Sequence, residues 1–409
     1  MNRIHPDALA SIQFNLHWHH GQVSHTDSYY ASRVNLWRDQ LPADLHGSLL
    51  GCRPGEQVSL SRKIEGDFPP FDPDARVRLP LARFNRMFRP ESPLIPRYGR
   101  FYPKGVLRHM PGIFKNNMHP FRYGEEDSGR FEADLNHPLA GRSLALTASV
   151  EKVYEKIDER GGTSVNWLEA ISEGPGMQAR LNGRPTDFFA ASSEGLRLGC
   201  PDERPDTVFY ETPRMVNHID SQARSIITGL YERLIPTEAA VLDLMGSWNS
   251  HLSSDQALSR VTGLGLNDEE LAANTRLSDF VIHDLNADPA LPLADNVYDA
   301  VVCTVSVEYL TAPQAIFAEV ARVLTPGGIF VVTFSNRWFP PKAIDLWPEC
   351  HEFERLGLVT EYFLQSGKYD NIETWSLRGY PRPVDDKYFP EQPLSDPVYA
   401  VWGRTHQGE

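Results

Sequence analysis

The N-terminal part of the chain alternates apolar and polar residues in short stretches. Ile12–Trp18 and Leu144–Val150 alternate throughout, and Val58–Ser61 repeats the pattern after a Pro-Gly turn. Such alternation is typical of half-buried strands. Leucines at helical spacing predict one short helix over residues 41–50, whereas the many prolines of residues 66–120 predict loops and sheet edges. This part of the chain is therefore expected to consist mainly of strands and turns.

From residue 214 onward the pattern changes to continuous apolar stretches separated by helical spacing. Amphipathic helices are predicted over His218–Leu234 and Gln314–Leu324. Buried strands are predicted at Ala239–Leu244, Arg260–Leu264, Ala300–Val305 and Ile329–Phe334. Continuous apolar strands that alternate with helices favour a parallel sheet covered on both faces. In such sheets ligands bind at the carboxyl ends of the strands, near the point where the strand order reverses.

A segment rich in glycine and proline joins the two parts. Residues 156–213 contain a Gly-Gly pair, a Gly-Pro-Gly string and further prolines, and they are longer than an ordinary loop. One short helix is expected near Val165–Ile171. The pattern thus predicts a first domain over residues 1–155, a linking and packing segment, and a second domain over residues 214–409.

Charge and composition exclude several classes of function. The 409 residues carry 40 basic and 54 acidic side chains, a net charge of −14, without a basic stripe, so no nucleic-acid partner is expected. No apolar run approaches the roughly 18 residues that cross a bilayer, and no secretory signal is apparent. Four cysteines lie far apart in the sequence. A cytoplasmic protein without membrane association is expected.

Four sequence strings in the second part occur in a fixed order. They are Val241–Leu244, Asp284, Asp299–Cys303 and Val323–Gly328. Together they resemble the class I S-adenosylmethionine-dependent methyltransferases of the type 11 kind. The resemblance implies an α/β Rossmann-like domain with a mostly parallel seven-stranded sheet, and it implies S-adenosyl-L-methionine as the cofactor.

The same resemblance implies which residues bind the cofactor. Asp243 would lie beside its methionine and ribose parts, and Asp284 would accept a hydrogen bond from the adenine amino group. The expected cofactor-binding set is Asp243, Met245, Gly246, Ser247, Trp248, Gly265, Leu266, Asn267, Asp284 and Leu285.

The sequence departs from the family pattern in two places. The loop Asp243–Asn249 lacks glycine at the three positions where the family has it, and glycine there allows the backbone to approach the cofactor closely. The residues at these positions are Met245, Ser247 and Asn249. Gly265 stands where the family has an acid that holds the ribose hydroxyls, so Asn267 or Asp268 is the expected substitute. These departures leave a non-enzymatic interaction or chaperone protein as the alternative interpretation.

Candidate residues for the methyl acceptor lie on two segments. Glu308 and Tyr309 follow the fourth strand, where the family places acceptor-side residues. Arg214 and His218 precede the first helix and could hold a carboxylate of the cofactor or of the acceptor. Trp248 could cap the cofactor or simply pack. No residue is assigned a catalytic role, since methyl transfer depends mainly on orientation, and the acceptor itself stays open.

A second resemblance concerns residues 1–155. Its strings are Leu16–Trp18, Thr26–Ser28, Leu41–Glu56, Tyr98–Gly99 and Asp134–Gly141. They resemble FKBP-type peptidyl-prolyl isomerases of the SlyD-like branch, which implies an α+β FKBP-like domain with a flap at about residues 101–133. The residues that it places in the isomerase pocket are Trp18, Asp27, Leu36, Leu41, Leu45 and Tyr98.

Taken together, the two resemblances predict a methyltransferase of unknown acceptor fused to a prolyl isomerase or peptide-binding module. Such a module would raise the local concentration of a peptide or protein acceptor. Isomerase activity alone is a further alternative. His17, His19, His20 and His25 are interpreted as structural or surface residues, and no metal site is expected.

Overall fold

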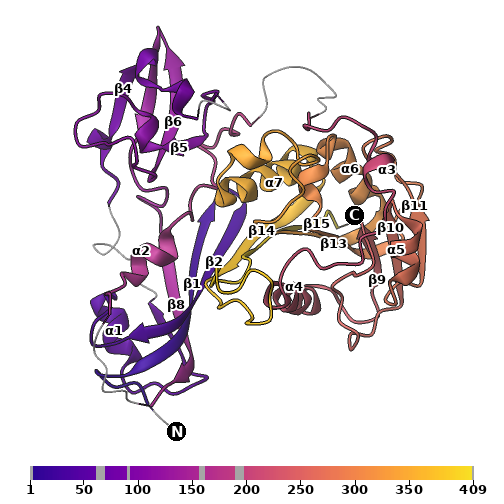
Figure 1. Cartoon of the computed structure of the whole chain (residues 1–409), viewed down its shortest axis with the longest axis horizontal. Coiled ribbons are helices and arrows are strands. Elements are labelled where there is room, and N and C mark those ends of the chain that lie inside the picture. The colour runs from indigo at the N-terminus through magenta and orange to yellow at the C-terminus, as the bar shows by residue number, and fades with distance from the viewer. Residues whose placement is uncertain (1–2, 61–69, 90–92, 156–161, 189–197, 408–409) are drawn as a thin grey trace.

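The computed structural model describes residues 3–60, 70–89, 93–155, 162–188 and 198–407. One sheet of eleven strands runs through most of the chain (Figure 1). Its strand order is β11 (Asp279–Ile282), β10 (Arg260–Gly265), β9 (Ala240–Leu244), β12 (Tyr298–Thr304), β13 (Leu324–Phe334), β15 (Val398–Thr405), β14 (Tyr369–Arg378), β2 (Val23–Asn35), β1 (Leu9–His20), β8 (Leu144–Val153) and β3 (Gln57–Leu60).

The C-terminal part of this sheet is the predicted parallel α/β unit. Strands β9 to β13 run parallel, and β15 and β14 add antiparallel pairings at the end. Helices α6 (Pro313–Val323) and α7 (Glu352–Ser366) cover one face, and α4 (Ser221–Leu234) covers the other (Figure 1). The short helix α5 (Asp268–Ala273) follows β10. The strand order reverses between β9 and β12, which places a ligand site at their carboxyl ends.

The N-terminal part of the sheet consists of antiparallel strands. Strand β1 pairs with β2 and β8, and β8 pairs with β3, as the alternating pattern predicts. Helices α1 (Ala43–Leu49) and α2 (Trp167–Ser172) pack on one core with these strands. Phe14, Leu45 and Trp167 are buried in that core. The predicted short helices at 41–50 and 165–171 are therefore confirmed within a few residues.

A second, smaller sheet is inserted between β3 and β8. Its order is β4 (Arg76–Pro80), β7 (Arg130–Asp134), β6 (Pro120–Asp127) and β5 (Phe101–Pro103). A separate aromatic core supports it, with the rings of Phe84 and Tyr102 edge to face at 5.0 Å. Figure 1 shows this sheet as a distinct body. The inserted unit extends beyond the expected flap at residues 101–133, since it also includes β4.

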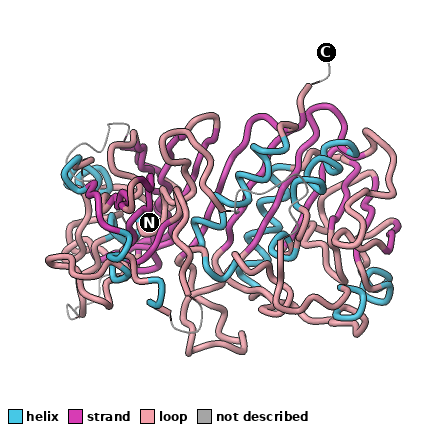
Figure 2. The backbone as a smooth tube through the Cα atoms, turned by 90° about the horizontal axis from the view of Figure 1, so that it is seen from above, coloured by secondary structure: helices cyan, strands magenta, loops and turns pink. Residues whose placement is uncertain are grey.

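The two parts of the large sheet meet where β14 pairs with β2. This pairing is parallel and runs from Glu373 opposite Ser24 to Arg378 opposite Tyr29. Figure 1 shows the two halves joined through these strands, and Figure 2 shows the two halves side by side from above. The expected mostly parallel seven-stranded sheet is present as strands β11 to β14 of this order, but it is part of a larger mixed sheet. Its last strand is an interior strand of a larger sheet, because β2 covers an edge that would otherwise be open.

Asp27 lies at this junction and holds it from both sides. Its carboxylate is 1% exposed and accepts hydrogen bonds from Trp18 Nε1 at 2.9 Å and from Ser376 Oγ, on β14, at 2.9 Å. Gln178 Nε2, from the segment between the halves, donates to it at 3.2 Å. Burial raises the pKa of Asp27, and these donors oppose that shift. A single side chain thus connects both halves and the segment that joins them.

We expect the substitution Asp27→Ala to lower the free energy of unfolding by about 3 kcal/mol, because buried donors lose their acceptor. Urea unfolding followed by circular dichroism measures this. The matched control is Glu151→Ala, which removes an exposed acid on β8, two strands away in the same sheet, and should change stability by less than about 0.5 kcal/mol. A loss below about 1 kcal/mol for Asp27→Ala would contradict the role given to this residue.

Candidate functional site

One pocket opens at the carboxyl ends of β9, β10, β11 and β12. A covering segment, residues 206–219, passes over it and includes helix α3 (Asp206–Phe209). Phe339, which follows β13, adds to the wall. All ten residues of the expected cofactor-binding set line this pocket. The loops that carry them are far apart in the sequence and meet because their parallel strands end at the same sheet edge.

Asp243 forms the buried floor of the pocket. Its side chain is 2% exposed, and no described residue provides a hydrogen-bond partner for Oδ2. Desolvation raises the pKa of Asp243 to about 7, against the effect of a hydrogen bond from Ser250. Buried polar atoms in proteins are almost always paired. An unpaired acceptor beside a pocket therefore indicates a position for ligand donors.

The loop after β9 keeps its tight course without the family's glycines. Met245 adopts φ +56°, the left-handed region that a glycine would accept more readily, and Gly246 donates to Leu264 O at 2.8 Å. A Cβ atom at Gly265 would lie 2.4 Å from the Gly246 carbonyl oxygen. Gly265 therefore cannot be replaced by the family's acid without moving the loop. The missing acid reflects this close backbone contact.

The two residues expected to substitute for that acid, Asn267 and Asp268, lie in other environments. Asn267 caps helix α5 through Glu270 N, and its Nδ2 donates to Tyr210 O at 3.0 Å and to Glu211 O at 3.1 Å. Asp268 is exposed and does not line the pocket. Asn267 thus fastens the covering segment instead of presenting an open side chain.

Glu270 lines the pocket although the sequence reasoning missed it. Its Oε1 accepts the Arg214 N–H at 2.6 Å, and Ser247 Oγ donates to Oε2. The spacing Asn267-x-x-Glu270 is that of a helix N-terminus, where the side chain at the third helical position points back toward the cap. That spacing was the available signal for a carboxylate at this edge of the sheet.

The far end of the pocket carries the predicted acid Asp284. Its Oδ1 accepts the N–H groups of Asn286 at 3.0 Å and Ala287 at 3.1 Å, which fixes the carboxylate at the pocket wall. Leu285 beside it is buried. An acid and an apolar side chain together suit a flat, amino-bearing ring.

Three of the four expected acceptor-side residues line the pocket, and they gather around Phe339. The Arg214 guanidinium lies 5.3 Å from the Phe339 ring centre, and the rings of His218 and Tyr309 lie 5.0 and 6.1 Å from it. Among the described residues, Arg214 Nη1 has no hydrogen-bond partner. Partial desolvation lowers the pKa of His218. This wall combines a guanidinium that has one unpaired nitrogen with neutral aromatic rings. Such a wall suits a planar group that bears a negative charge.

Glu308 is the fourth residue expected on the acceptor side, and its position differs from that expectation. It belongs to a short 3-10 helix, Val307–Tyr309, which turns its side chain into the core; it is 0% exposed and does not line the pocket. Neither of its carboxylate oxygens has a hydrogen-bond partner among the described residues. Desolvation raises the pKa of Glu308 to about 8, and the charge of Arg355 opposes this. Glu308 therefore does not contact an acceptor in this arrangement.

The covering segment also contacts the loop after β9 directly. Trp248 Nε1 donates to Val216 O at 3.2 Å, and Asn249 Nδ2 donates to Asn217 Oδ1 at 3.4 Å. Trp248 thus helps to close the pocket through the covering segment, in addition to lining it.

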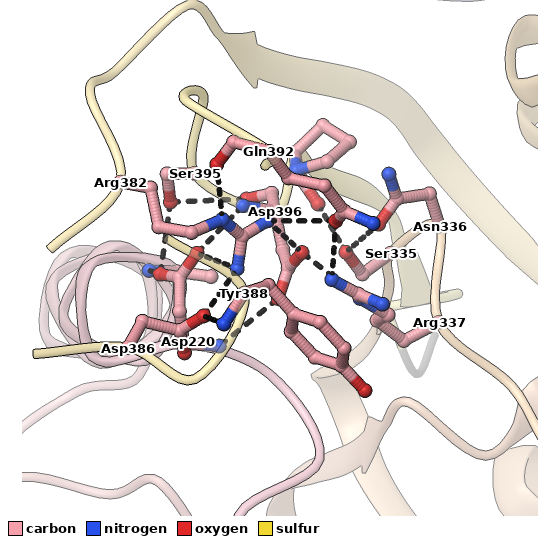
Figure 3. Close-up of polar contacts among 12 residues, drawn as sticks. Asp220, Ser335, Asn336, Arg337, Arg382, Asp386, Tyr388, Gln392, Ser395 and Asp396 are labelled. Carbon is pink, nitrogen blue, oxygen red and sulfur yellow. Dashed lines mark hydrogen bonds and ion pairs between the residues drawn. The ribbon is translucent and has the colours of Figure 1, made fainter. Parts of the chain in front are cut away.

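A buried ion cluster fixes both ends of the acceptor wall (Figure 3). Arg382 is buried and pairs with Asp220 at 3.3 Å and with Asp396 at 2.7 Å. Arg337 pairs with the same Asp396 at 3.0 Å. Asp220 directly follows the covering segment, and Arg337 lies two residues before Phe339. The C-terminal loop thus holds the two segments that form the acceptor wall.

The pocket that the isomerase resemblance implies is filled. Trp18 and Asp27 are hydrogen bonded to each other, and Gln178 and Ser376 occupy the remaining positions around the carboxylate. The three leucines of the expected pocket, Leu36, Leu41 and Leu45, pack in the N-terminal core. Tyr98 lies in the inserted unit, where its hydroxyl donates to Leu181 O at 3.2 Å. The structure brings together only part of the expected isomerase pocket, and those residues are packed in the core.

Among the described residues, no group of three or more histidine, cysteine, aspartate or glutamate side chains has the geometry of a metal site. No described helix is both long enough and apolar enough to cross a bilayer.

Comparison with known proteins identifies one domain. Residues 245–332 match a family model described as a methyltransferase domain. No curated protein matches the chain. The comparisons give no support to the FKBP-type resemblance of residues 1–155. Residues 245–332 are therefore similar to a methyltransferase domain, and the cofactor that this family implies is S-adenosylmethionine.

Solved structures with a similar fold include several methyltransferases. A chain from the Haloferax volcanii complex of the Trm112 methyltransferase activator with a methyltransferase is 17% identical, with 46% of this chain and 92% of that chain covered and a TM-score of 0.35. An S-adenosylmethionine-dependent methyltransferase from Mesorhizobium loti is 18% identical, with 43% and 96% covered and a TM-score of 0.30. The [4+2]-cyclase SpnF is 18% identical, with 53% and 100% covered and a TM-score of 0.37. These likenesses are too distant to indicate an activity.

Glu308 leads to a prediction about stability and pH. With its pKa raised to about 8, the folded protein retains a proton that the unfolded chain loses above its ordinary value of about 4.5. We therefore expect the stability of the natural protein, relative to Glu308→Gln, to fall by about 1.4 kcal/mol per pH unit between pH 5 and pH 7.

Chemical unfolding at a series of pH values measures this difference. Glu232→Gln, an exposed site on α4, is the control and should show a pH profile parallel to that of the natural protein. Parallel profiles for Glu308→Gln as well would show that Glu308 titrates normally.

Proposed function

We propose that this protein is an S-adenosylmethionine-dependent methyltransferase whose acceptor binds beneath the covering segment. The observation that supports this most strongly is the convergence of all ten expected cofactor-binding residues on one pocket. The unpaired oxygen of Asp243 at its floor fits a ligand with several hydrogen-bond donors. The close contact between Gly246 and Gly265 keeps the loop after β9 in place, although this loop lacks glycine at the family's three positions.

Each part of the pocket has a role in this function. Asp284 accepts a hydrogen bond from the adenine amino group while Leu285 packs on the ring, and Asp243 accepts donors of the ribose and methionine parts. When bound, the cofactor supplies an activated methyl group on its sulfonium. Trp248 and the covering segment exclude water from the reacting groups. The protein contributes mainly orientation, which is the principal requirement of methyl transfer.

The acceptor side favours a substrate with an anionic group. Arg214 provides a guanidinium with an unpaired nitrogen, and Phe339 and Tyr309 provide aromatic faces. His218, whose pKa is lowered, is neutral at physiological pH and can accept a proton from the acceptor. A carboxylate on a planar molecule or on a peptide satisfies these groups equally well.

We do not extend the function to prolyl isomerisation. The catalytic cleft of such a module must be open to a peptide, whereas Asp27 here is surrounded by side chains of the chain itself. The N-terminal half contributes β2 to the shared sheet.

Isothermal calorimetry with S-adenosylhomocysteine tests the proposal. We expect micromolar binding that weakens at least tenfold in Asp243→Asn and in Asp284→Asn, because each substitution removes a charged acceptor. Affinity should rise between pH 6 and pH 8 as Asp243 ionises, since its pKa is about 7, and Asp243→Asn should abolish this dependence.

Asp268→Asn is the matched control, because Asp268 is exposed near the same pocket, and it should bind like the natural protein. Absence of binding at millimolar ligand would reject the enzyme and favour an interaction protein with a degenerate pocket.

A further inference from the structure

Helix α5, which follows Gly265 and β10, carries a carboxylate that lines the pocket. Glu270 faces the pocket, whereas its neighbours Asp268 and Glu269 are exposed. Asn267 is occupied by the cap of α5 and by the covering segment. Among the acids that follow β10, Glu270 is thus the one that the helix presents to a ligand.

The present contact of Glu270 shows what it can bind. Ser247 Oγ donates to its Oε2, so this oxygen already accepts an O–H group within the pocket. Ser247 occupies one of the positions where the related family has glycine. Ser247, where the family has glycine, therefore shares a hydrogen bond with Glu270, an acid on the helix that follows β10.

The other oxygen of Glu270 is bound to the covering segment. Its Oε1 accepts the Arg214 N–H at 2.6 Å. From the same helix, Asn267 holds the carbonyl groups of Tyr210 and Glu211. The N-terminus of α5 thus fixes the stretch of chain that carries Arg214 and His218, which are residues of the acceptor wall.

We propose that Glu270 binds the ribose hydroxyls of the cofactor and, through the Arg214 N–H, couples cofactor binding to the position of the acceptor wall. This rests on the proposed function. A carboxylate accepts several hydrogen bonds at once, so Oε2 exchanges Ser247 for the ribose while Oε1 keeps Arg214. With its Oε2 also held by the ribose, Glu270 would hold the covering segment more firmly. The acceptor wall, already formed in the structure, would thus become more rigid when the cofactor binds.

A comparison of two ligands and two variants tests the ribose contact. The ligands are S-adenosylhomocysteine and its 2′-deoxy analogue, measured by calorimetry on the full chain. With the natural protein, the missing hydroxyl should weaken binding at least tenfold. Glu270→Ala should weaken S-adenosylhomocysteine at least tenfold and should no longer distinguish the two ligands. Glu269→Ala, one residue away and exposed, should behave like the natural protein.

Hydrogen–deuterium exchange tests the coupling. S-adenosylhomocysteine should slow exchange over residues 206–219 in the natural protein and in Glu269→Ala, but not in Glu270→Ala at saturating ligand. Glu270→Gln keeps a carbonyl oxygen for Arg214 and serves as a second variant if Glu270→Ala is unstable. It should still lose discrimination between the two ligands, because it lacks the charge.

The outcomes separate this proposal from the proposed function. If the natural protein binds S-adenosylhomocysteine and Glu270→Ala retains both affinity and ligand discrimination, Glu270 is not the ribose ligand. If the exchange of residues 206–219 does not respond to ligand in the natural protein, the coupling is rejected. If the natural protein binds neither ligand, the proposed function itself fails.

Discussion

The parallel pairing of β14 with β2 is the constraint on which the rest of the molecule depends. It joins two sheets that would each end in an exposed edge, and it places Asp27 between Trp18 of one half and Ser376 of the other. Open edges invite pairing with other chains, so their mutual burial favours a single continuous body. The side chains that meet at this junction surround Asp27, so no open cleft remains there.

At the other end of the sheet, close backbone packing decides how the ligand pocket is built. The loop after β9 approaches β10 so tightly that Gly265 cannot bear a side chain. The carboxylates that line the pocket therefore come from other positions, among them Asp243, Glu270 and Asp284. Glu270 also holds the covering segment, and the Arg382 cluster fixes Asp220, which directly follows that segment (Figure 3). The cofactor side and the acceptor side of the pocket thus depend in part on the same residue, Glu270.

Local sequence patterns predicted much of this architecture. Apolar stretches and helical spacing gave β9, β10, β12 and α4 within a few residues, and parallel topology then brought the ten cofactor-binding residues to one edge. Non-local contacts were not predictable in this way. Nothing in the pattern of β2 shows that it pairs with a strand about 350 residues later, and the direction of Glu308 depends on a single turn of 3-10 helix. The short strings that resemble an isomerase describe local shape and do not show whether a cleft between them is filled.

The most direct test of the account is a crystal structure of the protein grown with millimolar S-adenosylhomocysteine. The account predicts the nucleoside in the pocket beneath residues 206–219, with the adenine amino group at Asp284 and a ribose hydroxyl within about 3 Å of the Glu270 carboxylate. A ligand ordered elsewhere on the molecule, or a pocket that stays closed by its own side chains at that concentration, would contradict it.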